Sequence, residues 1–392
     1  MFEGKKLAIA NFCKRSTELV SKARGCATDG GKCRGEALPE TFAPGDWVKL
    51  NDDAKSGLQQ PWQVVEFDAQ TDTLTLTHPQ FGNSQLQRPR QDVIALVYSP
   101  RIQKPNLHKL HQLLIEPIQQ FLPENPDEQV IFIPHQELFS VPFAALQDEE
   151  DNYLIEQHTI RTAPSIQALQ LTKQRQNKLG KPDISQSQLV VVGNPDMPNN
   201  PEKPGEDVKL SSLPFAENEA NQIADLFNTT ALIGSQATET TVVEKMQTAD
   251  IIHFATHGLL GKYTGGSIPG AIALSEDNQN DGILTADELF NLENQLSAQL
   301  VVLSACGTGR GEITGDGVIG LSRSLMSAGV PSILVTLWSI PDDSTAFLMN
   351  EFYQQLLTNP DRAQALRQAM LITMKAYPGD LNWAAFTLIG ES

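Results

Sequence analysis

The chain contains two regions that differ in their pattern of hydrophobic and polar residues. Between residues 44 and 98, apolar and polar residues alternate with a period of two, and turn-forming residues separate the alternating segments. The segments are 45–50, 61–68 and 72–78, followed by the apolar segment 92–98. Short strands at this spacing predict a small β-barrel, SH3-like in its pattern, which we assign to residues 38–100.

From Asn106 onward, apolar runs of strand length alternate with segments of helical periodicity. The strand-like runs are 130–133, 189–192, 251–255, 271–274, 300–303 and 333–337, and the helical segments include 240–246, 319–328 and 346–356. This alternation predicts an α/β domain over residues 106–392, with a mostly parallel sheet sandwiched by helices. We expect 106–235 to be a non-catalytic half that supports the sheet and 236–392 to be the catalytic half.

Two segments lack such periodicity. Residues 1–37 contain several glycines without a regular apolar pattern, which is typical of a flexible N-terminal arm. Residues 199–212 are rich in Pro, Glu and Lys, and we expect them to form an exposed loop.

Composition narrows the possible functions. The chain has 29 Lys and Arg against 47 Asp and Glu, a net charge of −18, which argues against nucleic acid as a general partner. No apolar run reaches the length of a membrane span, and the N-terminal apolar residues are too few for a signal peptide, so we expect a cytoplasmic protein that does not bind membranes. We expect no cofactor.

The four cysteines do not form a disulfide framework or a zinc motif. Cys13, Cys26 and Cys33 lie in the polar first forty residues, whereas Cys306 stands alone at the end of an apolar run. This distribution is compatible with a reducing compartment and one special thiol. A lone buried cysteine is more often a small hydrophobic residue than a nucleophile, so Cys306 needs a partner to be a catalytic candidate.

His257 supplies that partner. It ends the segment D-I-I-H-F-A-T-H-G as Cys306 ends L-V-V-L-S-A-C, and the two residues are 49 positions apart. Functional groups gather at the carboxyl ends of parallel strands, so the two strand ends predict a thiol nucleophile beside an imidazole base. The N–H groups of Gly258 and Cys306 are candidate oxyanion donors. The spacing resembles that of caspases, whose histidine lies about 50 residues before the cysteine.

The region from Asn106 onward resembles the CHAT domain, which we describe as a bacterial branch of the caspase–separase group. The motifs that carry the resemblance are I-P-H-Q-E-L-F-S-V-P-F-A-A-L at 133–146, Y-L-I-E at 153–156, A-P-S at 163–165, H-F-A-T-H-G at 253–258, L-S-A-C-G-T-G at 303–309, G-D-G-V-I-G-L-S-R at 315–323 and T-L-W-S-I at 336–340. The resemblance implies a caspase-like cysteine endopeptidase with His257 as base and Cys306 as nucleophile. It also implies a protein or peptide substrate and a tetratricopeptide-repeat segment or other regulatory protein partner, although the sequence shows no such repeat.

Substrate preference does not carry over from caspases. The caspase signature Q-A-C-[RQG]-G is met only in part, since Ser304 and Thr308 differ from it. The segment L-W-S-I-P-D-D at 337–343 resembles separases, in which an acidic residue at this position recognises a basic P1 side chain. We match it to Asp342, with Asp343 as the near alternative, and expect cleavage after Arg or Lys.

Other interpretations stay open. The chain could be a non-catalytic signalling or assembly module with a caspase-like fold, or a thiol amidase acting on a small molecule. His253 is expected to be a core residue with satisfied polar atoms, and His135 a surface residue in a loop.

Two loops resemble ligand-binding motifs. Residues 277–288 nearly fit a calcium loop, but Gln279 breaks the pattern, and Thr285 with Glu288 predicts a capping box; we expect no metal. The glycine-rich segment 307–317 lacks the lysine of a phosphate loop and is better explained as an active-site loop. We expect Asp316 to cap a helix that starts near Val318.

Overall fold

The computed structural model describes most of the chain. The described residues are 28–29, 32–33, 39, 41–51, 62–78, 84–98, 100–180, 183–201, 203, 205–259, 261, 267–304, 315–338, 342–377 and 379–392. The predicted N-terminal arm lies outside them, except for the short antiparallel pair β1 (Thr28–Asp29) and β2 (Lys32–Cys33). The chain divides into two compact units, one with the small β module and one with the large sheet.

The small β module is a five-stranded antiparallel sheet. Its strands are β3 (Trp47–Leu50), β4 (Trp62–Asp68), β5 (Thr73–Thr77), β6 (Gln85–Pro89) and β7 (Val93–Tyr98). In the sheet they lie in the order β6-β5-β4-β3-β7. A short 3-10 helix, Arg90–Asp92, connects β6 to β7 along the chain. In β5, Leu74 and Leu76 are buried between half-buried threonines, as the period of two requires. The predicted small β module is confirmed.

The large unit contains an eight-stranded sheet in the order β11-β10-β12-β16-β17-β18-β9-β8. Its strands are β8 (Gln129–Phe132), β9 (Thr159–Thr162), β10 (Leu189–Pro195), β11 (Leu232–Gly234), β12 (Ile251–Ala255), β16 (Leu300–Leu303), β17 (Ser332–Thr336) and β18 (Phe386–Gly390). The first five strands of this order are parallel, β18 is antiparallel to β17, and β18, β9 and β8 are parallel to one another. The predicted mostly parallel sheet is confirmed, with one reversal of direction.

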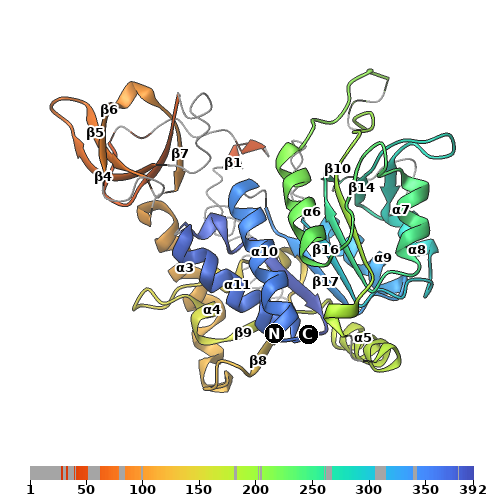
Figure 1. Ribbon diagram of the computed structural model, residues 1–392. Helices are drawn as coiled ribbons and strands as arrows, with labels where there is room; N and C mark the ends of the chain where they lie inside the picture. Colours follow the sequence, from red (N-terminus) through yellow and green to blue (C-terminus); the bar gives the residue numbers. More distant parts are fainter. Residues whose placement is uncertain are drawn as a thin grey trace. The chain divides into compact units, whose positions relative to one another are not determined.

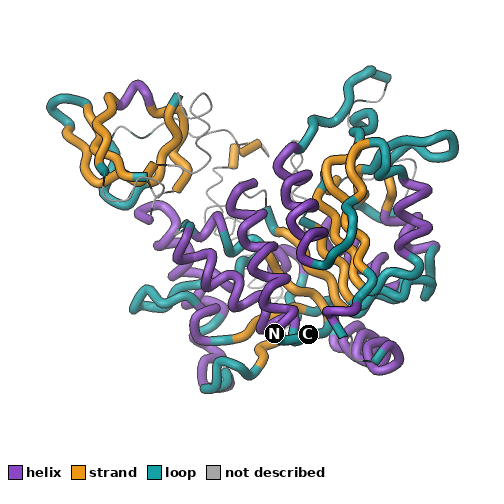
Figure 2. The backbone as a smooth tube through the Cα atoms, viewed as in Figure 1, coloured by secondary structure: helices purple, strands orange, loops and turns teal. Residues whose placement is uncertain are grey.

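Helices cover both faces of this sheet (Figures 1 and 2). The α-helices among the described residues are α3 (Pro100–Leu114), α4 (Leu154–Gln157), α5 (Ile166–Leu179), α6 (Pro214–Leu226), α7 (Glu239–Met246), α8 (Ala286–Asn291), α9 (Gly315–Ser327), α10 (Asp342–Thr358) and α11 (Arg362–Ala376). Side chains of α7, α8 and α9 share one core with Ile252 and Phe254 of β12. His253 points to the opposite face, where it meets α6 and α10.

A second small sheet follows β12 directly. It consists of β13 (Gly258–Leu259), β14 (Ala271–Ala273) and β15 (Ile283–Thr285), all antiparallel. The predicted strand at 271–274 therefore exists, but outside the main sheet. The calcium-like segment 277–288 runs from the turn after β14 through β15 into the start of α8, so it does not join two helices, and no group of His, Cys, Asp or Glu side chains in the described residues is arranged to hold a metal.

Two predictions about helix starts have different outcomes. The capping box at α8 is confirmed: Thr285 Oγ1 accepts from the N–H of Glu288, and Glu288 Oε2 accepts from the N–H of Thr285 at 2.8 Å. The expected cap at Asp316 is wrong, because α9 begins at Gly315 and Asp316 lies inside its first turn.

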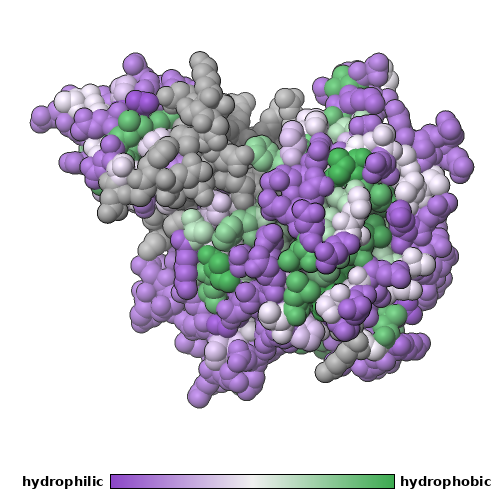
Figure 3. Space-filling view, in the orientation of Figure 1, coloured by the Kyte–Doolittle hydropathy of each residue, from purple (hydrophilic) through white to green (hydrophobic). Residues whose placement is uncertain are grey.

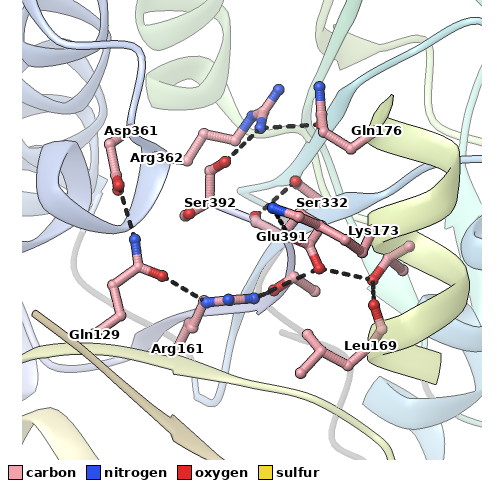
Figure 4. A network of polar contacts seen from close by, with 12 residues as sticks. Gln129, Arg161, Leu169, Lys173, Gln176, Ser332, Asp361, Arg362, Glu391 and Ser392 are labelled. Carbon is pink, nitrogen blue, oxygen red and sulfur yellow. Dashed lines mark hydrogen bonds and ion pairs between the residues drawn. The ribbon is translucent and has the colours of Figure 1, made fainter. Parts of the chain in front are cut away.

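A buried polar network fixes β18 at the reversal in the sheet (Figure 4). Arg161 of β9 donates to the carbonyl of Gly390 and forms an ion pair with Glu391 at 3.8 Å. Ser332 of β17 donates to the carbonyl of Glu391 at 2.7 Å. Arg362 of α11 donates to the carbonyl of Ser392, and burial lowers the pKa of its guanidinium to about 10. The end of the chain is thus bound to both neighbouring strands and to α11.

Hydrophilic residues predominate on the face drawn in Figure 3, with hydrophobic patches between them. Among the described helices, none combines the length and the hydropathy that crossing a membrane would require.

Glu239 at the start of α7 is a buried carboxyl group with only 4% of its surface exposed. Its Oε2 atom has no hydrogen-bond partner among the described residues. Burial, together with the nearby charges of Glu288, Asp281 and Asp277, raises its pKa to about 7. The folded protein therefore binds this proton more tightly than the unfolded chain does.

We predict that Glu239→Gln changes how stability depends on pH. Between pH 4.5 and about 7 the wild type loses stability as pH rises, because the unfolded carboxyl has lost its proton while the folded one keeps it, so that folding must take up a proton. The variant carries no such group. Denaturant unfolding should give nearly equal stabilities at pH 4 and a variant about 1 to 3 kcal/mol more stable at pH 8. Equal stabilities at both pH values would contradict the raised pKa.

Gly193 of β10 allows α6 to pack closely on the sheet. A Cβ atom at this position would lie 2.4 Å from Cβ of Ala220 and 2.9 Å from the carbonyl oxygen of Ala216, both on α6. Such distances are too short for any side chain, so α6 would have to move away from β10.

We predict that Gly193→Ala destabilises the protein by about 1 to 3 kcal/mol through overpacking. Chemical denaturation with and without Ala220→Gly measures the coupling. The loss should be smaller when Ala220 is also replaced, because the second change removes the shortest contact. Strictly additive effects would show that the two positions do not press on each other.

Candidate active site

The pairing of β12 with β16 sets the geometry of the candidate site. The two strands are parallel neighbours, with Ile251 opposite Leu300 and Phe254 opposite Leu303. The register offset is therefore 49 residues, the same as the separation of His257 from Cys306. Each candidate comes three residues after the last paired position of its strand. Cys306 itself, with the rest of 305–314, lies outside the described residues.

His257 is held in a defined orientation. Its ring is almost fully buried, and its Nε2 lies 2.7 Å from the backbone carbonyl oxygen of Ser211. A carbonyl oxygen can only accept, so Nε2 carries the hydrogen and, in the neutral ring, Nδ1 carries the lone pair. Burial lowers the pKa of His257 below its usual value, while the bond to Ser211 opposes this shift. The neutral ring can therefore act as a base through Nδ1.

The Ser211 carbonyl was missed by sequence reasoning. Ser211 belongs to the predicted exposed loop, and its side chain is indeed exposed, but its carbonyl group turns toward the buried histidine. The loop leaves the end of β10, the parallel neighbour of β12, and so emerges at the same edge of the sheet. The half of the domain that we expected to be non-catalytic thus contacts His257. No residue type signals such a role, since every residue has a backbone carbonyl.

The backbone after His257 is fixed by β14. Thr256 Oγ1 donates to the carbonyl of Ala273 at 2.8 Å, and the N–H of Ala273 donates to the carbonyl of His257 at 2.9 Å. Hydrogen-bonded and non-hydrogen-bonded residue pairs alternate along an antiparallel ladder. His257 and Ala273 form a hydrogen-bonded pair, so the next pair, Gly258 and Ile272, is a non-hydrogen-bonded one. The N–H of Gly258 is thereby directed away from β14.

His253 lies within β12, four residues before His257, and is completely buried. Its Nε2 is 3.0 Å from Oε1 of Glu219 on α6, and its Nδ1 is 3.2 Å from the hydroxyl of Tyr353 on α10. Burial and the charge of Glu219 raise the pKa of Tyr353 well above 10, so it stays a neutral phenol. The predicted core role of His253 is confirmed, and the contact joins α6 to β12.

The other candidates lie at different places in the fold. Asp342 and Asp343 are the first residues of α10, which follows the carboxyl end of β17, at the same edge of the sheet as the end of β12. Their side chains lie outside the described residues. His135 follows β8, which runs in the opposite direction, so it lies at the other edge and is exposed, as expected for a loop residue.

Comparison with known families agrees with this geometry. The sequence model of the CHAT domain matches residues 104–391. The chain belongs to the CHAT domain family. The family resemblance seen in the motifs is therefore confirmed, and the sheet with its strand ends is the fold of this CHAT domain.

Two mammalian proteins are similar to the chain in sequence. Tetratricopeptide repeat protein 28 of mouse is 30% identical, and the human protein of the same name 31% identical, over 358 residues each. Each alignment covers 81% of this chain but only 14% of the relative. The CHAT domain chain therefore spans a small part of these relatives, and their mammalian origin gives no support to a bacterial source.

Solved structures with a similar backbone are more distant. The Arg-specific cysteine proteinase gingipain R is 14% identical with a TM-score of 0.45, covering 75% of this chain and 68% of gingipain. Separase in the Saccharomyces cerevisiae separase–securin complex is 14% identical with a TM-score of 0.41, covering 75% of this chain and 18% of that one. We take nothing about the site or the substrate from likenesses this distant.

We predict that His257 titrates below pH 6.5, because burial disfavours the charged ring. NMR titration of the imidazole in a Cys306→Ala background measures this midpoint without interference from the thiol, and His257→Gln identifies the resonance. Since the folded ring binds its proton less readily than the unfolded one, acidification below pH 6.5 should also cost stability. A midpoint above 6.5 would contradict the burial of a neutral ring.

Proposed function

We propose that this CHAT domain is a cysteine endopeptidase in which Cys306 is the nucleophile and His257 the base. The observation that carries the proposal is the register of β12 and β16: both strands end at the same edge of the sheet, and His257 and Cys306 each follow the last paired residue by three positions in the sequence. The Ser211 contact supports it, because it leaves the lone pair of the neutral His257 ring on Nδ1.

In the proposed reaction, His257 takes the thiol proton and the Cys306 sulfur attacks the peptide carbonyl carbon. The N–H groups of Gly258 and Cys306 stabilise the resulting oxyanion. His257 then donates the proton to the leaving amine, and a thioester links the acyl group to Cys306. Water hydrolyses the thioester with His257 again acting as base, which releases the acid and restores the thiol.

For substrate choice, we propose that Asp342, or else Asp343, pairs with a basic side chain before the cleaved bond. Both follow the end of β17, next to β16 in the sheet, which supports a position near the thiol. We further propose that the domain is cytoplasmic and acts with protein partners. The second point is supported by the names of both mammalian relatives, which are tetratricopeptide repeat proteins.

Active-site labelling tests the proposal. We expect a peptidyl electrophile with Arg before the reactive group to modify the wild type at Cys306. It should not modify Cys306→Ala, and it should modify His257→Ala much more slowly than the wild type. General-base catalysis is worth about 10²- to 10⁴-fold, so His257→Ala should slow labelling by at least the lower figure. Asp342→Asn and Asp343→Asn form a matched pair, of which only one should lose the preference for Arg.

The same experiment separates the alternatives. A folded protein whose Cys306 reacts with no electrophile would be a signalling or assembly module. A thiol that reacts with small electrophiles and ignores every peptide would fit an amidase of small molecules. Equal labelling by Arg, Asp and Leu peptides would reject the proposed acidic pocket but keep the endopeptidase.

A further inference from the structure

Asn194 interrupts the regular pairing of β10 just before the strand ends. Its φ is +42°, in the left-handed region that asparagine tolerates better than most residues. The register between β10 and β11 shifts between Gly193 and Pro195, which makes Asn194 the extra residue of a β-bulge. A bulge breaks the alternation of side chains and redirects the residue that it contains.

The redirected side chain binds the segment that enters α6. Asn194 Oδ1 accepts from the N–H of Leu213 at 2.7 Å and from the hydroxyl of Ser212 at 3.1 Å. Its Nδ2 donates to Oε2 of Glu217 at 3.0 Å. The N–H of Leu213 can only donate, so the orientation of the amide is unambiguous. Three polar contacts thus hold one short segment against the end of β10.

That segment carries the carbonyl group that binds the candidate base. Ser211 immediately precedes Ser212, and its carbonyl oxygen accepts the Nε2 hydrogen of His257. Leu213 occupies the N-cap of α6 and has no side-chain oxygen to form a cap of its own. The side chain of Asn194, on the neighbouring strand β10, instead accepts from the N–H of the N-cap residue Leu213, and in doing so fixes the backbone two residues from Ser211.

We propose that Asn194 is a positioning residue of the active site, which holds the Ser211 carbonyl in place and thereby keeps the hydrogen of His257 on Nε2. This role rests on the proposed function of His257 as base. It differs from a simple helix cap, because a cap would stabilise α6 without any effect on the ring.

The tautomer of His257 is the decisive readout, since protonated and unprotonated ring nitrogens have distinct ¹⁵N chemical shifts. The measurement uses the full chain with Cys306→Ala, at a pH where the ring is neutral. Asn194→Gly removes the side chain while still permitting the positive φ. Ser165→Gly is the matched control, because Ser165 caps α5 by accepting from the N–H of Ala168 and lies at the other edge of the sheet.

We expect the wild type and Ser165→Gly to show one tautomer with Nε2 protonated. Asn194→Gly should show averaged shifts from a mixture of both tautomers. In an Asn194→Gly variant that retains Cys306, kcat for a peptide should fall about tenfold or more, because His257 is misoriented. KM should change by less than about twofold, because the substrate contacts are kept.

A charge exchange provides the rescue. Asn194→Asp keeps both acceptor contacts but puts a carboxylate against Glu217, so it should disturb the tautomer. Combining Asn194→Asp with Glu217→Gln places an amide donor at position 217 opposite the carboxylate acceptor at position 194. The double variant should therefore show the wild-type ¹⁵N shifts of the His257 ring. This pair also gives an answer if Asn194→Gly does not fold.

The outcomes separate the two proposals. If Asn194→Gly folds and its His257 tautomer is unchanged, the positioning role is overturned, regardless of peptidase activity. If Asn194→Gly does not fold, an unchanged tautomer in Asn194→Asp overturns it instead. A changed tautomer in a protein whose wild type cleaves no peptide would uphold the positioning role and reject the endopeptidase.

Discussion

The parallel pairing of β12 with β16 is the constraint on which the rest of this structure depends. Side chains of a strand alternate between faces, so a slip of one residue would exchange every inward and outward position of β12. The observed register puts Phe254 and Ile252 into the core with α7, α8 and α9, and leaves His253 for the polar contacts with α6 and α10. Because both faces are buried, a register shifted by one residue would turn His253 into the apolar core, and the position of His257 after β12 depends on this register.

The second constraint comes from the neighbouring strand β10. The loop after it supplies the carbonyl that orients His257, so the helix at the end of that loop must be placed accurately. Two features serve this placement: the absence of a side chain at Gly193 of β10, which lets α6 approach the sheet, and the buried contact of Glu219 on α6 with His253. A buried carboxyl–imidazole contact is an expensive way to attach a helix, but it is directional, whereas apolar packing allows sliding.

Periodicity in the sequence was sufficient to predict the small β module and five strands of the large sheet, β8, β10, β12, β16 and β17, whereas β9, β11 and β18 were not predicted. An apolar run also carries no information about strand direction, so the antiparallel pairing of β18 with β17 could not be predicted from periodicity. The diversion of β14 into a separate sheet was not predictable from its apolar pattern either. The contribution of Ser211 could not be predicted, because it comes from a backbone group in a polar loop.

The partner of His257 also determines what kind of base it can be. A carboxylate beside Nε2 would orient the ring and at the same time stabilise its charged form, whereas a carbonyl oxygen orients it with a much weaker effect on charge. In this site burial outweighs the carbonyl and lowers the pKa of the ring. On the proposed mechanism, the imidazolium then forms only when a negative charge, on the thiolate or on the oxyanion, is next to it. Orientation is thus built into the folded chain, while the charge that drives the reaction arises with the substrate.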